Sequence, residues 1–243
     1  MVRAILESRY ADEVRKSDVE AVVASIRDDP LRRRPYRYLS PGSASPEPAE
    51  PLPGPIPVVL VKDHERHWVH DRGYYEAPSR IAAIQRALAP SGLVREVPAR
   101  SWPDRHMAAV HRADYLRFLA AVARATGERS LYADVFPPRG RNRRPTDPLL
   151  QAGWYCIDSF TPLNGAAIGA ARHAVDCALT AADLNLKGEH ASYALVRPPG
   201  HHAESDLFGG YCYYNNTAIA AQFLVERLGR LPILDIDYHH GNG

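Results

Sequence analysis

The stretch "YALVRPPGHHAESDLFGGYCYYNNTAIAAQFLVERLGRLPILDID" (residues 193–237) predicts a strand, a helix and a second strand in succession. Residues 193–200 form a short apolar run that enters a proline and glycine turn. Residues 217–228 have apolar side chains at helical spacing, and residues 231–237 form another apolar run. Two strands joined by one helix are typical of a parallel βαβ unit, whose ligands bind beyond the carboxyl ends of the strands.

The same alternation of strands and helices extends towards the N-terminus. Residues 56–61, "IPVVLV", form the β-branched run that a buried parallel strand shows. Helices are predicted over residues 77–92, 110–126 and 165–184. We therefore predict an α/β fold in which an open parallel sheet lies within a three-layer αβα sandwich.

The domain boundary is predicted from a segment rich in proline, serine and glycine. Residues 40–55, "SPGSASPEPAEPLPGP", have the composition of an extended linker. Residues 1–39 precede it and contain loosely helical spacing between Ala4 and Ile26. We predict an N-terminal extension with linker over residues 1–55, followed by a catalytic domain portion over residues 56–243.

Composition limits the classes of function. The 243 residues carry a net charge of only +2, which favours neither direct nucleic-acid binding nor a membrane surface. No segment approaches the roughly 20 apolar residues of a membrane span, and the charged N-terminus differs from a signal peptide. A cytoplasmic location is expected. The three cysteines, at positions 156, 177 and 212, lack metal or redox spacing and suit small packing groups.

Metal-binding residue types follow the predicted strand 231–237. Because side chains alternate along a strand, Asp235, Asp237 and His239 share one face. The carboxylate of Asp237 and the imidazole of His239 suit Zn²⁺, but a catalytic zinc ordinarily has three protein ligands. Asp235 lies deeper, where its charge needs a partner. The alternative is that these polar side chains serve only as turn caps.

Two adjacent histidines follow the other strand of the unit. His201 and His202 come after Pro-Pro-Gly, where one imidazole is placed to move a proton while its neighbour steadies charge. Asp235 is a candidate to orient the first ring. Solvated loop histidines are the alternative interpretation. In the next segment, "FGGY", we expect the glycines to allow close approach of substrate and Phe208 and Tyr211 to form the walls of an apolar channel.

Three motifs carry a family resemblance. In order and spacing, "RPPGHHA", "GGYCYYNN" and "DIDYHHGNG" resemble the zinc-dependent superfamily of histone deacetylases and acetylpolyamine amidohydrolases. The resemblance covers residues 56–243, and "FPPRGRNRRPTD" followed by "GWYC" is similar to the acetylpolyamine branch. It implies an arginase-type fold and hydrolysis of an acylated lysine or acylated amine by a zinc-activated water.

The resemblance also implies roles for individual residues. The metal ligands would be Asp237 and His239 for zinc, with Asp235 helping to hold a monovalent cation, usually potassium. The acid–base group would comprise His201 paired with Asp235 and His202 near Asn242. The substrate tunnel would be lined by Gly210 and Tyr211, and Arg80 resembles the internal arginine of the family.

The chain departs from the family pattern in two respects. Leu149 and Phe160 stand where acetylpolyamine enzymes have acidic residues, although Asp147 and Asp158 lie nearby and are candidates to bind substrate in their place. The family's third zinc ligand and its catalytic tyrosine lie beyond the "HHGNG" motif, so we expect a fold that is incomplete at the C-terminus. The alternative function is that of a truncated, inactive homologue that acts as a binding module. The sequence does not decide whether the protein forms a homo-oligomer. Another metal hydrolase of the arginase superfamily is disfavoured by "PPGHH".

Overall fold

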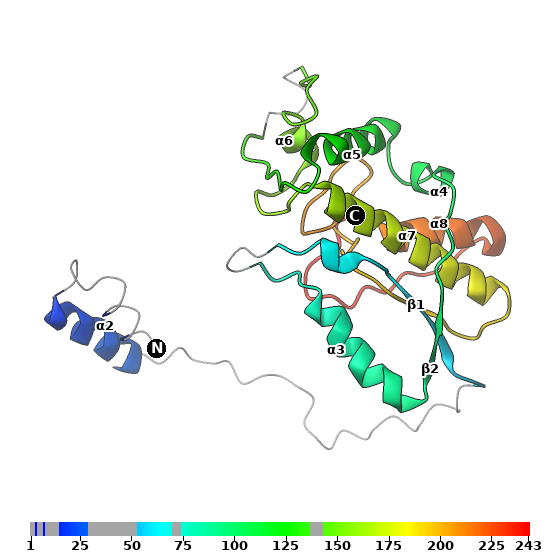
Figure 1. Ribbon diagram of the computed structural model, residues 1–243, viewed down its shortest axis with the longest axis horizontal. Coiled ribbons are helices and arrows are strands. Elements are labelled where there is room, and N and C mark those ends of the chain that lie inside the picture. The colour runs from blue at the N-terminus through cyan, green and yellow to red at the C-terminus, as the bar shows by residue number, and fades with distance from the viewer. Residues whose placement is uncertain (1–2, 4–6, 8–14, 29–52, 70–73, 137–142) are drawn as a thin grey trace. The chain divides into compact units, whose positions relative to one another are not determined.

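The computed structural model describes residues 3, 7, 15–28, 53–69, 74–136 and 143–243 (Figure 1). Their contacts divide the chain into one unit at Met1–Pro51 and another at Leu52–Gly243. The first unit contains helix α2 (Lys16–Asp28) and an ion pair in which Arg3 Nη2 donates to Glu20 Oε2 at 2.8 Å. Most of the N-terminal half of the predicted helix 4–26 and most of the predicted linker lie outside the described residues.

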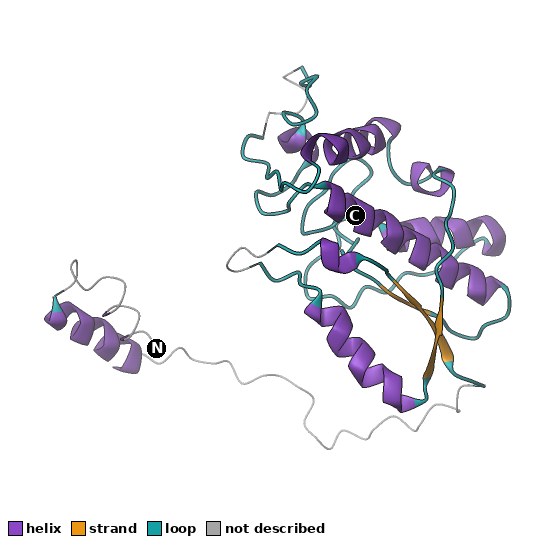
Figure 2. Cartoon of the chain, viewed as in Figure 1, coloured by secondary structure: helices purple, strands orange, loops and turns teal. Residues whose placement is uncertain are grey.

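The second unit is built on a three-stranded parallel sheet (Figure 2). Strand β1 (Ile56–Leu60) lies in the centre, between β2 (Val94–Val97) and β3 (Tyr193–Leu195). In the register, Val58 lies opposite Glu96 on one side and Tyr193 on the other. The parallel sheet predicted from the sequence is thus confirmed.

Helices cover both faces of this sheet (Figure 1). Helix α3 (Ser79–Leu88) packs on one face and helix α7 (Gly165–Leu186) on the other. One apolar core joins the layers, since Ile81 of α3 and Cys177 of α7 belong to the same cluster as Val58 and Val59. Helices α5 (Ala113–Thr126) and α8 (Asn216–Leu228) pack against α7. The short helices are η1 (His64–Arg66), η2 (Ala89–Ser91), α4 (Arg105–Ala108) and α6 (Ala152–Tyr155).

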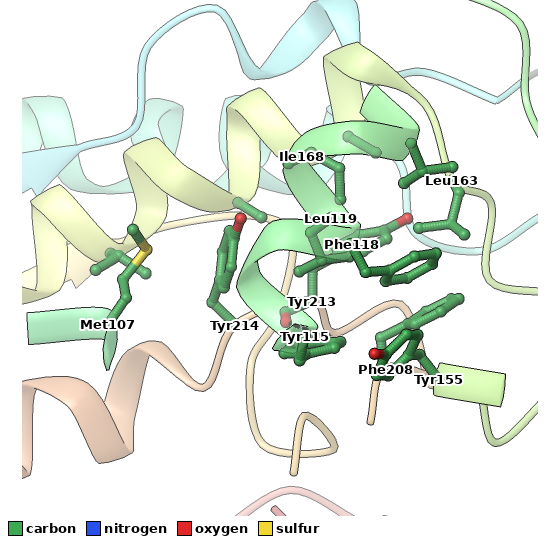
Figure 3. Close-up of a cluster of buried hydrophobic side chains, with 14 of the residues drawn as sticks. Met107, Tyr115, Phe118, Leu119, Tyr155, Leu163, Ile168, Phe208, Tyr213 and Tyr214 are labelled. Atoms are coloured by element: carbon green, nitrogen blue, oxygen red, sulfur yellow. Dashed lines mark hydrogen bonds between the residues drawn. The ribbon is translucent and has the colours of Figure 1, made fainter. Parts of the chain in front are cut away.

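A second core is rich in aromatic side chains and joins α5, α6, α7 and α8 with the loop before α8 (Figure 3). The rings of Phe118 and Tyr155 stack with centroids 4.5 Å apart, and Phe208 and Tyr213 stack at 6.1 Å. Tyr115 donates its hydroxyl to the Tyr213 carbonyl at 2.6 Å, so its buried polar atom is satisfied. This core anchors the loop that carries the polar residues after β3.

The predicted strand 231–237 is not a strand in the structure. Within the described residues no strand pairs with it, and its apolar side chains are bare, with Leu234 86% and Ile236 89% exposed. An extended segment becomes a strand only when its backbone is hydrogen-bonded to a neighbouring strand. An apolar pattern alone therefore also predicts strands in segments that lack such a neighbour. Conversely, β2 was not predicted because two of its four residues, Arg95 and Glu96, are charged.

The three cysteines are free and buried, as the sequence predicted. Burial raises the pKa of each thiol, at Cys156, Cys177 and Cys212, to about 12. The thiols therefore act as small apolar groups at neutral pH. Among the helices described here, none has both the length and the apolar character needed to span a bilayer.

Candidate functional site

A cavity of about 420 Å³ opens beside the turn that follows β3. It collects residues from four segments of the chain that are distant in sequence. Its lining comprises Tyr75, Glu76, Arg80, Phe160, Pro199, His201, His202, Gly210, Tyr211, Asp237 and His239. The cavity therefore brings together the polar residues that follow both strands of the predicted βαβ unit.

Each of the adjacent histidines is held by a different side chain. His201 Nδ1 lies 2.8 Å from Asp235 Oδ2, and His202 Nδ1 lies 2.7 Å from Asn242 Oδ1. Both oxygens accept hydrogen bonds, so each Nδ1 carries a proton and each Nε2 keeps its lone pair while the ring is neutral. The amide of Asn242 is oriented by its own donation from Nδ2 to Glu204 Oε1 at 2.8 Å. The two ring centroids are 4.1 Å apart.

The carboxylate of Asp235 is fixed from two sides. The backbone N–H of Asp237 donates to Asp235 Oδ1 at 3.0 Å, while His201 donates to the other oxygen. These hydrogen bonds, with the backbone contribution the larger, lower the pKa of Asp235 below its usual value. Asp235 therefore presents a charged acceptor that sets the tautomer of His201.

Asp237 and His239 supply only part of a zinc site. His239 donates to Asp237 Oδ1 through its backbone N–H at 2.8 Å and through Nδ1 at 2.9 Å, and these bonds lower the pKa of Asp237. Two donors are one fewer than a catalytic zinc ordinarily has. The described ranges contain no group of three or more histidine, cysteine or acidic side chains arranged to hold a metal. These residues alone therefore do not complete a catalytic zinc site.

Three residues differ from their predicted places: two of them do not line the cavity, and one is exposed although it was predicted to be internal. Phe208 does not form a wall of the cavity: it is 0% exposed, and it stacks on Phe118 and Tyr213 in the aromatic core. Asp158 does not line the cavity, because its carboxylate is bonded to the surrounding loop. Arg80, predicted to be internal, is exposed at the rim of the cavity.

The buried arginine of this region is Arg197, which the sequence did not single out. Its Nε donates to Glu76 Oε1 at 2.8 Å, and its guanidinium also bonds the second Glu76 oxygen and the His64 carbonyl. The Arg197 and Glu76 side chains are 3% and 2% exposed. Arg197 stands directly before the Pro-Pro-Gly turn, so the pair ties the histidine loop to the segment around residue 76.

Comparison with known proteins identifies the family of this chain. Residues 74–243 match the model of the histone deacetylase domain. An acetylpolyamine amidohydrolase from Mycoplana ramosa is 40% identical over 176 residues, which cover 70% of this chain and 51% of the relative. Acetylpolyamine amidohydrolase 1 of Pseudomonas aeruginosa is 37% identical over 177 residues, covering 70% of this chain and 51% of its own length.

A solved structure gives the same result. The crystal structure of an acetylpolyamine aminohydrolase from Burkholderia pseudomallei matches with a TM-score of 0.70 at 35% identity, over 77% of this chain and 58% of that one. The chain spans about half the length of the curated relatives named here. The matched domain, the sequence identity and the shared fold together place this chain in the superfamily of histone deacetylases and acetylpolyamine amidohydrolases.

Proposed function

We propose that the intact protein containing this chain hydrolyses acyl-amides, removing an acetyl group from an acylated lysine or another acylated amine. The observation that carries the proposal is the pair His201 and His202, each held through Nδ1 and both lining one cavity. Two imidazoles in contact, one paired with a carboxylate and one with an amide, suit acid–base catalysis by histidine.

The different partners suggest different roles for the two histidines. The neutral amide of Asn242 holds His202 with a free Nε2, which is the atom to accept a proton from an attacking water and return it to the leaving amine. His201 has the Asp235 carboxylate behind it as a counter-charge, so it steadies charge beside His202. Hydrolysis consumes one water and yields a free amine and a carboxylate.

We further propose that Asp237 and His239 contribute two ligands to a zinc ion, and that Asp235 helps to bind a monovalent cation such as potassium. A zinc ion would polarise the attacking water and the substrate carbonyl. The resemblance to the family motif and the position of both residues in the cavity support this assignment. Zinc would displace the hydrogen bond between His239 and Asp237.

The experiment compares variants of the intact protein by turnover of an acetyl-lysine peptide and by metal content. His202→Ala should keep its zinc and lose about 10²-fold or more in kcat, because it removes the proton carrier. Asp237→Ala should lose the metal. His190→Ala, at an exposed residue outside the cavity, is the control. A wild-type kcat in His202→Ala contradicts the proposal, and binding of acylated ligand without turnover by the wild-type protein supports a binding module instead.

The lining of the cavity predicts the choice of substrate. Glu76 is paired with Arg197, and the aromatic ring of Phe160 lines the cavity at the place of an expected acid. The nearby Asp147 accepts from the Leu149 N–H at 2.8 Å, so it caps its own turn. A polyamine's additional cationic centres would therefore lack partners here.

We expect the intact protein to give a higher kcat/KM with an acetyl-lysine peptide than with acetylspermidine. The two substrates should be compared side by side at one ionic strength, because screening weakens contacts with a cationic substrate. The Phe160→Glu variant should shift the preference towards acetylspermidine, while Ser159→Ala serves as the neighbouring control. A clear preference of the wild-type protein for acetylspermidine contradicts this expectation.

A further inference from the structure

The carboxylate of Asp158 is the centre of a hydrogen-bonded loop beside the cavity. Its Oδ1 accepts from the backbone N–H groups of Phe160 at 2.9 Å and Thr161 at 2.8 Å. Its Oδ2 accepts from the Thr161 hydroxyl at 2.8 Å and from the Gly210 N–H at 2.6 Å. Four donors converge on two oxygens, so the carboxylate has little capacity left for a substrate.

Thr161 extends this network to the next residue of the cavity wall. Its hydroxyl, which donates to Asp158, also accepts from the Tyr211 N–H at 3.0 Å. Thr161 is 0% exposed, so water cannot replace these bonds in the folded structure. Asp158 and Thr161 together therefore hold two consecutive backbone N–H groups, those of Gly210 and Tyr211.

The backbone that they hold is strained and lies against a catalytic candidate. Tyr211 has a φ of 65° and Gly210 a φ of 56°, and the left-handed region is unfavourable for a tyrosine. A Cβ added to Gly210 would lie 2.1 Å from Cδ2 of His202, so this backbone packs directly against the ring. Strain of this kind persists only where surrounding contacts impose it.

The network also fixes the aromatic side of the cavity. Phe160 is bonded to Asp158 through its backbone, and its ring meets that of Tyr211 edge to face with centroids 5.4 Å apart. Both rings line the cavity. The half-buried Asp158 and the buried Thr161 thus hold both aromatic residues and the glycine beside His202.

We propose that Asp158 and Thr161 are positioning residues that hold the Phe160, Gly210 and Tyr211 wall in its substrate-binding shape. The proposal rests on the proposed acyl-amide hydrolysis. It differs from the sequence prediction for Asp158, because the carboxylate acts through the wall and does not bind a substrate cation. Asp235 and Asn242 hold the histidines independently of this network, so loss of the network affects substrate binding more than turnover.

The first test is kinetic and uses a matched pair in the intact protein. Thr161→Val keeps the side-chain volume but removes the hydroxyl, whereas Thr161→Ser keeps the hydroxyl. We expect Thr161→Val to raise KM for an acetyl-lysine peptide about tenfold with kcat nearly unchanged, while Thr161→Ser stays close to wild type. The control is Ser159→Ala, an exposed residue of the same loop. A loss that falls on kcat with KM unchanged overturns the proposal.

The second test does not depend on activity. Hydrogen exchange in the segment 208–213 should be about tenfold faster in Thr161→Val than in wild type, and unchanged in Thr161→Ser and Ser159→Ala. If Thr161→Val does not fold, Asp158→Asn carries the same expectation, because its amide NH₂ would face backbone donors. Wild-type exchange in the folded variant overturns the proposal. An inactive wild-type protein that still shows the exchange difference refutes the proposed function and supports the positioning network.

Discussion

His67 is a buried histidine whose ring nitrogens find no hydrogen-bond partner among the described residues. Its ring contacts those of Tyr74 and Tyr213 edge to face. Desolvation, assisted by the nearby Arg197 cation, lowers the pKa of His67 to about 4. The carboxylate of Glu76 is 3.6 Å away but is already bonded to Arg197. His67 is therefore neutral in the folded protein near pH 7.

This shift predicts that stability falls on acidification. In the unfolded chain the histidine pKa is near 6.5, so between about pH 6.5 and pH 4 the unfolded state binds the additional proton. The free energy of unfolding should decrease by up to about 1.4 kcal/mol per pH unit there, and by about 3 kcal/mol over the window. Urea unfolding at pH 7.5, 6.0 and 5.0 measures the slope.

The variant His67→Leu should flatten that slope, because it replaces the titrating ring with an apolar side chain of similar volume. His190→Leu, at an exposed position, should leave the slope as it is in wild type. Equal slopes in wild type and His67→Leu would show that other groups, such as the buried His111, whose pKa is also lowered by desolvation, carry the acid sensitivity.

For single residues, the sequence analysis predicted which side chains lie together better than it predicted whether a side chain is buried in a core or exposed in the cavity. The family resemblance implied that Asp235 pairs with His201, and in the structure His201 Nδ1 lies 2.8 Å from Asp235 Oδ2. The prediction for Phe208 was wrong because an aromatic residue before two glycines looks the same in a channel wall and in a core. Arg197 and Glu76 lie 121 residues apart in sequence, and no local pattern joins them.

The link between the loop at Glu76 and the end of β3 depends on one buried ion pair. Removing one partner of such a pair leaves a buried charge without compensation, which costs about 3–5 kcal/mol. Arg197→Met should lower the free energy of unfolding by that amount in urea titrations. Glu76→Met/Arg197→Met together should cost less than the sum of the two single changes, because neither charge remains.

A purely additive double variant would contradict this interpretation of the pair. Arg95→Met provides a comparison on the surface, because its partner Glu189 lies at a partly exposed position. An exposed pair is expected to contribute at most about 1 kcal/mol. The difference between the two arginine variants isolates the effect of burial.

At the scale of the elements, the apolar pattern predicted helices and strands correctly where another helix or strand covers the apolar side chains. It predicted a strand wrongly where the described residues provide no such cover. β1 and α7 were predicted almost to their ends, since their apolar side chains lie in shared cores. The segment 231–237 has the same kind of pattern but no pairing strand within the described residues. β2 has a poor pattern and is a strand because the edge of β1 pairs with it.

On the scale of the whole molecule, the two contact units should be thermodynamically separable. The described contacts divide between Met1–Pro51 and Leu52–Gly243. We expect deletion of residues 1–51 from the intact protein to change its free energy of unfolding by less than about 0.5 kcal/mol. Thermal and urea unfolding of both forms, followed by circular dichroism, is the measurement. A loss of several kcal/mol in the shortened form would show that the N-terminal unit contributes to the fold of the second.

The burial of all three cysteines has a practical consequence for spectroscopy. Thiolates are the species that react with maleimides, and these thiols are both shielded and hardly ionised at neutral pH. The native cysteines of this chain should therefore not react with maleimides, and none of them has to be replaced before a labelling site is introduced. A single Ser159→Cys substitution would give one reactive thiol at an exposed position directly before Phe160, which lines the cavity. A fluorophore attached there would report in real time when a ligand enters or leaves.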